Sequence, residues 1–189
     1  MKLLIASDVH GSPERAEFLC RKAADWQPDN IILLGDLLYH GPRNPLPQGY
    51  LPKDVASILG NLPAPVIAVR GNCDAEVDLK LLPFCVQDTA LICADHLRIL
   101  ALHGQHLPPE PPFGMGLGAG MVLLCGHTHI PMARTVGGIH QWNPGSTTLP
   151  KHGWQPSYGL YEDGEFRVMS IDGKEILRHK PAERHKECV

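Results

Sequence analysis

The sequence predicts a single α/β domain, with a parallel sheet in its first half and mostly β-structure in its second half. Over the first 70 residues, short apolar runs alternate with segments of helical character, an order typical of a parallel sheet with right-handed crossovers. From about residue 84 onward, apolar runs follow one another with turns between them, as in hairpins. The chain of 189 residues shows no internal repeat or linker. We therefore expect one domain over residues 1–178 and a charged, flexible tail over 179–189.

In the first half, expected strands and helices alternate. Ser12–Glu14 offers an N-cap serine, a proline at the first helical position and an early acidic residue, so a helix should run to about Trp26. A loop rich in Pro and Gly follows between Tyr39 and Pro52, and a short helix is expected over Lys53–Asn61. The expected buried strands are the apolar runs Lys2–Ala6, Ile31–Leu34 and Pro65–Val69.

The second half consists of short apolar runs between turns. Dipeptides such as Asp163-Gly164 and Asp172-Gly173 are hairpin signals. The expected strands lie at residues 90–94, 97–102, 121–125, 132–136, 139–142, 158–162, 165–170 and 174–178.

The composition excludes several classes of protein. Apolar residues make up 43% of the chain and the formal charge is -3, so a core can form, and disorder, collagen and coiled coil are excluded. No apolar run is long enough for a membrane helix or a signal peptide, so we expect a soluble cytoplasmic protein. The 6 cysteines lack a CxxC spacing and are expected to be free thiols. Without a block of Lys or Arg, neither stable nucleic-acid binding nor membrane binding is expected.

Polar residues with metal-binding side chains come directly after the expected strands, next to glycines that let the backbone approach a ligand closely. In an open α/β sheet, ligands bind beyond the carboxyl ends of the strands. Folding should therefore gather these side chains along one rim. The residues are Asp8, His10, Asp36, Asn72, His103, His127 and His129.

These donors are more numerous than the four ligands of one tetrahedral ion. Two ions about 3.5–4 Å apart that share one carboxylate would use all of them, as in phosphatases and nucleases. A donor set of nitrogen and oxygen atoms without a thiolate favours Mn, Fe or Zn, and the residues alone do not choose among these metals.

The motifs resemble a known family when they are taken together. Asp8-x-His10, Gly35-Asp36, Gly71-Asn72-x-Asp74, His103 and Gly126-His127-x-His129 resemble the five-block pattern of calcineurin-like metallophosphoesterases. Asn143–Ser146 resembles a later element, and the loop at residues 36–44 is similar to that of small bacterial phosphodiesterases of the YfcE type. The resemblance implies a four-layer αββα sandwich of two mixed β-sheets flanked by helices.

The resemblance also implies how two divalent ions are held. The first ion would bind Asp8, His10, Asp36 and His129, and the second would bind Asp36, Asn72, His103 and His127. We expect Mn²⁺, with Zn²⁺, Fe or Mg²⁺ as alternatives. The expected reaction is attack of a metal-bridging hydroxide on a small phosphodiester. The expected catalytic residues are Asn72, Cys73, Asp74 and His103.

Cys73 departs from the pattern of many relatives, which have a histidine there that is thought to protonate the leaving oxygen. A thiol with an ordinary pKa of about 8.5 matches that role poorly at neutral pH. We therefore expect faster turnover of substrates whose leaving group needs little protonation. His40 or His106 could take the role instead.

Two loops have two interpretations each. His40, Arg43 and Asn44 belong either to a surface loop stiffened by prolines or to a phosphate clamp in which Arg43 supplies paired donors. His106 either supports His103 or faces the substrate. Leu107–Gly120, rich in Pro and Gly, is either a plain connection or a mobile lid.

The predicted partner is a small phosphodiester substrate. Alternatives are a phosphomonoesterase, a nucleotide polyphosphate hydrolase, or a non-catalytic protein-binding scaffold on the same fold. The sequence leaves open whether the chain forms a homo-oligomer.

Overall fold

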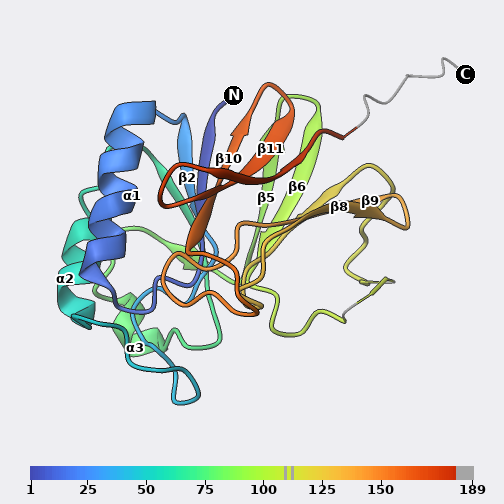
Figure 1. Cartoon of the computed structure of the whole chain (residues 1–189). Helices are drawn as coiled ribbons and strands as arrows, with labels where there is room; N and C mark the ends of the chain where they lie inside the picture. The colour runs from blue at the N-terminus through green and yellow to red at the C-terminus, as the bar shows by residue number, and fades with distance from the viewer. Residues whose placement is uncertain (109, 112, 182–189) are drawn as a thin grey trace, which may run out of the picture.

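Two mixed β-sheets face each other in the computed structural model, which describes residues 1–108, 110–111 and 113–181 (Figure 1). The 7-stranded sheet has the order β12 (Glu175–His179), β11 (Glu165–Ser170), β10 (Ser157–Glu162), β1 (Leu3–Ala6), β2 (Asn30–Leu33), β3 (Val66–Val69) and β4 (Val86–Gln87). The 5-stranded sheet has the order β5 (Thr89–Ala94), β6 (Leu97–Leu102), β7 (Val122–Leu124), β9 (Ile139–Asn143) and β8 (Met132–Val136). The expected pair of mixed sheets is confirmed.

The strand pairing joins the two halves of the chain. β1, β2, β3 and β4 are parallel to one another, while β10 lies antiparallel to β1 and continues into the antiparallel strands β11 and β12. In the second sheet, β6, β7 and β9 are parallel, and β5 and β8 are antiparallel edge strands. The late strand β10 therefore completes the sheet that the N-terminal segment begins.

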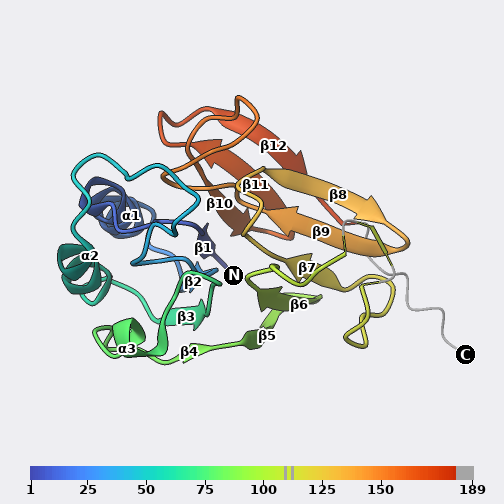
Figure 2. The ribbon, with the colours of Figure 1, turned by 90° about the horizontal axis from the view of Figure 1, so that it is seen from below.

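The helices lie on the outer face of the 7-stranded sheet (Figure 2). They are α1 (Pro13–Trp26), α2 (Pro52–Leu59) and the short α3 (Glu76–Leu79), which the sequence did not predict. Pro13 stands at the start of α1, as expected, but the side chain of the N-cap residue Ser12 makes no capping hydrogen bond. Gln27 ends α1 in the left-handed region, with φ at 53°. Among the helices of the described residues, none is long and apolar enough to cross a membrane.

Alternation along the central strands separates two cores. Leu4 and Ala6 of β1 pack toward the helices, whereas Leu3 and Ile5 point into the space between the sheets. Trp142 of β9 lies fully buried in this second core, stacked on Phe166 with ring centroids 4.8 Å apart. Because both faces of β1 are buried, its sequence is a continuous apolar run.

The outer face of the 5-stranded sheet differs from the helix-flanked face. Phe113, Leu107 and Leu117 pack there against Leu102 and Leu123. The described part of residues 103–121 contains no helix, so this layer is a packed loop.

At the other end of the chain, β12 reaches His179, one residue into the expected tail. Phe166 of β11 pairs with His179, so the strand continues through this residue, and the indole nitrogen of Trp142 donates to its side chain at 2.9 Å. Residues 182–189 of the expected tail lie outside the described residues.

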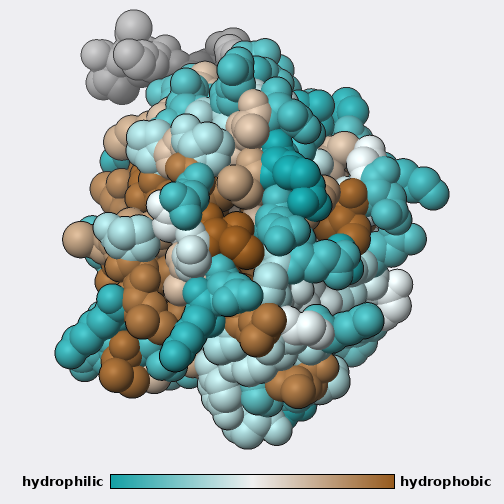
Figure 3. Space-filling model, turned by 90° about the vertical axis from the view of Figure 1, so that its left-hand side faces the viewer, coloured by the Kyte–Doolittle hydropathy of each residue, from teal (hydrophilic) through white to brown (hydrophobic). Residues whose placement is uncertain are grey.

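Figure 3 views the side on which α1 and α2 lie. Hydrophobic patches are interspersed there with hydrophilic side chains. Large exposed hydrophobic side chains of the described residues include Leu46, Leu51, Val77 and Leu81.

Candidate metal centre

The loops that carry the candidate ligands meet at one end of the two sheets, the lower end in Figure 1. Parallel pairing places the loops after β1, β2 and β3 at the same edge of the first sheet. The loops after β6 and β7 lie at the facing edge of the second sheet, since these strands are also parallel. The topology therefore brings together residues that are more than 100 positions apart, such as His10 and His129, which lie 119 apart.

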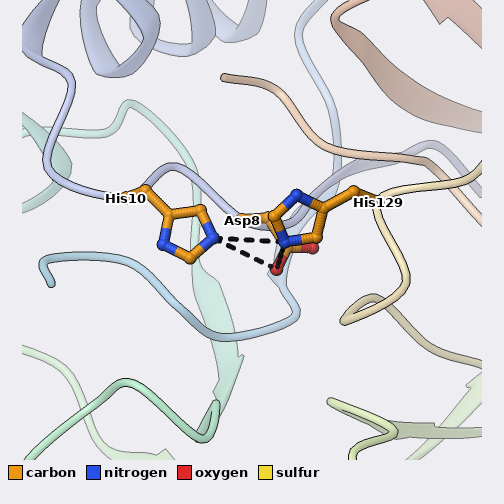
Figure 4. Close-up of side chains that lie close together, drawn as sticks. All are labelled: Asp8, His10 and His129. Atoms are coloured by element: carbon orange, nitrogen blue, oxygen red, sulfur yellow. Dashed lines mark hydrogen bonds and ion pairs between the residues drawn. The ribbon is translucent and has the colours of Figure 1, made fainter. Parts of the chain in front are cut away.

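One part of the centre, the Asp8 side, consists of Asp8, His10 and His129. These three residues are buried, with exposed fractions of 0%, 0% and 2%. The Nε2 atom of His129 lies 3.2 Å from Oδ1 of Asp8, and Nε2 of His10 lies 3.6 Å from the same oxygen. The two Nε2 atoms are 3.3 Å apart (Figure 4). All three side chains thus point at one small volume.

The backbone fixes which nitrogen of each imidazole faces this volume. Nδ1 of His10 lies 2.9 Å from the carbonyl oxygen of Tyr39, and Nδ1 of His129 lies 2.5 Å from that of Leu149. A carbonyl oxygen can only accept a hydrogen bond, so each Nδ1 carries the hydrogen and donates it. In the neutral rings, the Nε2 lone pairs then face Asp8, which is the tautomer of a metal-ligating histidine.

The other part of the centre, the Asn72 side, consists of Asn72, His103 and His127. Oδ1 of Asn72 lies 3.1 Å from Nε2 of His103, whose Nδ1 donates to the carbonyl oxygen of Leu34 at 2.6 Å. The ring of His127 lies 5.1 Å from that of His103, between centroids. Unlike the Asp8 side, this side is partly open, because Asn72 is exposed and His127 is half-buried.

Asp36 stands between the two sides. Its Oδ2 atom is 3.8 Å from Nε2 of His10 and 3.4 Å from Nε2 of His103. Asp8, Asp36 and His103 also offer ligand atoms that lie within 4.8 Å of one another. Asp36 therefore lies within reach of the candidate ligands on both sides of the centre.

The carboxylates and imidazoles of the centre shift one another's pKa values. Burial alone would raise the pKa of Asp8, but the imidazoles of His10 and His129 hold it well below its usual range. Burial likewise opposes the charged form of His103, yet Asp36 and the charge of Asp8 raise the pKa of His103 to about 9. The pKa of His127 is lowered, first by burial and then by His103.

A divalent cation fits this donor set. Oδ1 of Asp8 is fully buried and has no hydrogen-bond partner, although both Nε2 atoms of the Asp8 side point toward it. A buried carboxylate oxygen without a partner is costly. Facing lone pairs of nitrogen and oxygen attract a cation, and their composition suits a borderline metal such as Zn, Mn or Fe.

The ligand loops hold unusual backbone conformations. Non-glycine residues in the left-handed region are uncommon and cost of order 1–3 kcal/mol each, and they cluster at functional sites. Here the φ angles of several candidate ligands lie between 49° and 63°: Asp8, His10, Asp36, His127 and His129. The same turns aim the side chains inward, so this strain is part of how the site is built.

Asp74 holds one of these turns in place. Its carboxylate accepts hydrogen bonds from the backbone N–H groups of Asp36 at 2.7 Å, Leu37 at 2.9 Å and Gly71 at 2.9 Å. Sequence reasoning placed Asp74 among the catalytic residues; the structure shows it buried and fixing the position of Asp36. A Cβ atom on Gly71 would collide with Asp36, which explains the glycine there.

Cys73 lies beside Asp36, as expected from its position next to Asn72. Its backbone N–H donates to Oδ1 of Asp36 at 2.8 Å, and its sulfur lies within 4.8 Å of ligand atoms of His10 and Asp36. Burial and the charge of Asp36 raise the pKa of the Cys73 thiol to about 12. The thiol is therefore protonated at neutral pH in the absence of a cation.

The hydroxyl groups of Ser7 and Ser146 support Asp8, and sequence reasoning missed Ser7. Ser7 donates to Oδ2 of Asp8 at 2.6 Å, and Ser146 donates to the Asp8 carbonyl at 2.9 Å. Asn143 donates to the carbonyl of Gly126 at 2.8 Å. Asn143–Ser146, which resembled a later family element, thus ties the loop after β1 to the loop after β7.

The candidate substrate-binding residues do not all line the same cavity. Arg43 and Asn44 line a cavity of about 680 Å³ that opens beside Asp36, together with Lys151. His40 does not line this cavity; its ring packs between Tyr39 and Tyr50, with centroids 4.8 and 5.2 Å away. Sequence reasoning missed Lys151, because nothing in the sequence around it shows that its loop packs beside the candidate ligands.

His106 lines a second, adjoining cavity of about 580 Å³, together with His103 and Asn72. Asn44 has a structural contact as well, since its amide donates to the carbonyl of His40 at 2.8 Å. Of the candidates, therefore, Arg43, Asn44 and His106 face a cavity at the centre.

This fold and donor set define a metal-dependent phosphoesterase, and comparison with known proteins agrees. The chain matches the model of the calcineurin-like phosphoesterase superfamily domain over residues 1–164 and belongs to this family. It is 41% identical over 182 residues to phosphodiesterase YfcE of Escherichia coli K12, a match that covers 94% of this chain and 96% of the relative. The expected class is thereby confirmed.

Two further comparisons support the assignment. A probable metallophosphoesterase of Methanothermobacter thermautotrophicus is 30% identical over 183 residues, covering 93% of this chain and 89% of the relative. The solved structure of the E. coli phosphoesterase Yfce matches with a TM-score of 0.89 and 39% identity, covering 94% of this chain and 98% of that chain.

Proposed function

We propose that this protein is a phosphodiesterase that binds two divalent metal ions and hydrolyses small phosphodiesters. The observation that carries the proposal is the pair of donor clusters on either side of Asp36, with the buried, unpartnered oxygen of Asp8 at one of them. The similarity to phosphodiesterase YfcE supports the substrate class.

Each cluster would hold one ion, and Asp36 would contact both. The ligands of the first ion would be Asp8, His10, Asp36 and His129, and those of the second Asp36, Asn72, His103 and His127. Bound ions in such a pair activate water as a nucleophile and stabilise the charge of the phosphoryl group. We propose Mn²⁺ as the metal.

Residues of the first cavity would hold the substrate. The side chains of Arg43 and Lys151 line it, and they can neutralise the phosphate oxygens. The chain has no block of Lys or Arg to bind a polymeric backbone, which favours a small diester over a nucleic acid. We also propose a cytoplasmic location, as expected from the sequence.

The test uses bis(p-nitrophenyl) phosphate and the metal-free protein. Hydrolysis should be absent after chelation and return with Mn²⁺, with two ions bound per chain by elemental analysis. Asp36→Asn should lower the rate by about 100-fold or more, because the shared ligand loses its charge. Asp172→Asn, which changes an exposed aspartate in a turn, is the matched control and should keep full activity.

Other outcomes would reject parts of the proposal. Full activity of Asp36→Asn would reject the shared carboxylate. One bound ion per chain at full activity would reject the second site. Faster hydrolysis of p-nitrophenyl phosphate than of the diester would favour the phosphomonoesterase alternative. A chain that binds no metal at all would favour the scaffold.

A further inference from the structure

Two cavities meet at the candidate metal centre. The first has a volume of about 680 Å³ and the second of about 580 Å³. Arg70 and Asn72 line both, so these two residues form the wall between them. Asn72 is a candidate ligand of the second ion, and therefore a phosphate held at this ion would lie where the cavities join.

The first cavity is cationic. Its lining includes Arg43, Arg70 and Lys151. The carboxylates that also line it are already engaged: Asp74 accepts three backbone hydrogen bonds, and Asp36 lies between the candidate ligand clusters. Arg70 borders both cavities, and its Nε donates to the carbonyl oxygen of Asp74 at 3.0 Å. The positive charges that distinguish the first cavity are therefore those of Arg43 and Lys151, which are available to an anionic or strongly polar group.

The second cavity has a different chemistry. Met115 and Leu102 supply apolar surface, and Met115 is 50% exposed, so a bound group can cover its side chain. His106, Gln105 and Thr89 add polar edges. Besides Arg70 in the shared wall and the candidate ligand His103, the lining carries the carboxylate of Asp88, an exposed residue that would repel an anion.

We propose that the substrate is an asymmetric phosphodiester, with an apolar ester group in the second cavity and an anionic or polar ester group in the first. This inference rests on the proposed phosphodiesterase function. Met115 and Leu102 would contact the apolar group, and Arg43 and Lys151 the polar one. Each cavity is large enough for such a group, because whole small-molecule sites have volumes of about 300–1,000 Å³.

The test uses monoesters that carry one group each, as inhibitors of bis(p-nitrophenyl) phosphate hydrolysis by the Mn²⁺-loaded enzyme. Phenyl phosphate probes the second cavity, phosphoglycolate probes the first, and methyl phosphate is the reference. Phenyl phosphate should inhibit about five- to tenfold more tightly than methyl phosphate, since its ring leaves water. Phosphoglycolate should also inhibit more tightly than methyl phosphate.

Three variants test which cavity is responsible for the tighter inhibition by phenyl phosphate and by phosphoglycolate. Met115→Gln should reduce the advantage of phenyl phosphate to about twofold or less and keep the advantage of phosphoglycolate. Lys151→Gln should reduce the advantage of phosphoglycolate and keep the advantage of phenyl phosphate. The matched control is Leu91→Gln, because Leu91 is a 63% exposed apolar residue of β5 that lines neither cavity. It should leave both advantages unchanged.

Equal inhibition by phenyl and methyl phosphate, or the same result for Met115→Gln and Leu91→Gln, would overturn the two-cavity proposal while leaving the phosphodiesterase function intact. Failure to hydrolyse any diester would instead reject the function. In that event, calorimetric binding of the three monoesters to the metal-loaded chain still measures the preference of each cavity.

Discussion

The Asp8 side and the Asn72 side of the metal centre are built from similar residues but differ in how firmly they are held. Asp8, His10 and His129 are almost fully buried, and backbone carbonyls orient both imidazoles. On the Asn72 side, a backbone carbonyl orients the ring of His103, whereas Asn72 is exposed.

In the proposed two-metal centre, this difference would give the two sites unlike affinities. Ligands that are fixed before binding lose little freedom when an ion arrives, so the Asp8 side should bind its ion more tightly. The open Asn72 side borders both cavities, and an ion there would be reached by the substrate. The Asp8 side is thus suited to retain an ion and the Asn72 side to meet the substrate.

The largest expected effect comes from comparing His10→Gln with His127→Gln. His10→Gln removes a buried ligand of the Asp8 side and should lower activity by about 100-fold or more. His127→Gln removes a half-buried ligand and should lower it about tenfold, with recovery at high Mn²⁺. Metal titrations followed by rate measure both. Equal losses, equally restored by metal, would contradict the difference between the two sides.

A second expected effect concerns Asp74, which positions Asp36, the proposed shared ligand. Asp74→Asn replaces one oxygen acceptor with an amide donor facing backbone N–H groups, and the rate should fall about 10- to 100-fold. Both sides should lose affinity for metal, because Asp36 contacts both. Asp78→Asn, on α3, is the control. A loss of affinity on one side only would show that Asp74 does not act through Asp36.

Metal binding to the Asn72 side should depend on pH. The pKa of His103 in the folded, metal-free protein is raised to about 9, above the ordinary 6.5, so the ring is protonated at pH 7 and must lose its proton to bind metal. Affinity should therefore rise about tenfold per pH unit from pH 7 to 8 and level off above about pH 9.

The measurement is calorimetry in buffers that differ in ionisation enthalpy, which reports the protons released. The control is His103→Gln, which should bind metal weakly and without this pH dependence. Affinity that stays constant between pH 7 and 9 would contradict proton competition at His103.

The sequence predicted most strands of this fold to within one or two residues. Continuous apolar runs such as Leu3–Ala6 are typical of strands that are buried on both faces, as this one is. The candidate ligands were also predictable, since each follows a strand. The sequence did not predict β4, which has 2 residues, or the loop that covers the second sheet in place of a helix.

Other parts of the centre depend on long-range packing and leave no local pattern. Lys151 reaches the first cavity only because its loop packs beside His129, whose carbonyl accepts its backbone N–H at 3.3 Å. His40 has the right position in the chain but turns toward Tyr39 and Tyr50, because aromatic packing determines its direction.

The smallest expected effect concerns proton transfer to the leaving group, where the chain has Cys73 in place of histidine. Cys73 lines the first cavity, and Asn72 donates to its sulfur at 3.2 Å. Because burial and Asp36 raise its pKa to about 12, the thiol is a weak acid. Leaving groups such as p-nitrophenolate, which need little protonation, should therefore be favoured over phenolate.

Cys73→His would place a stronger acid at this position and should raise the rate on diphenyl phosphate about five- to tenfold relative to bis(p-nitrophenyl) phosphate. Cys85→His, at an exposed cysteine outside both cavities, should leave the ratio of the two rates unchanged. If Cys73→His changes both rates equally, position 73 does not protonate the leaving group. Position 73 would then affect only the geometry of Asp36, whose Oδ1 accepts the backbone N–H of residue 73. The preference for activated diesters would in that case have to arise from the bound metal ions.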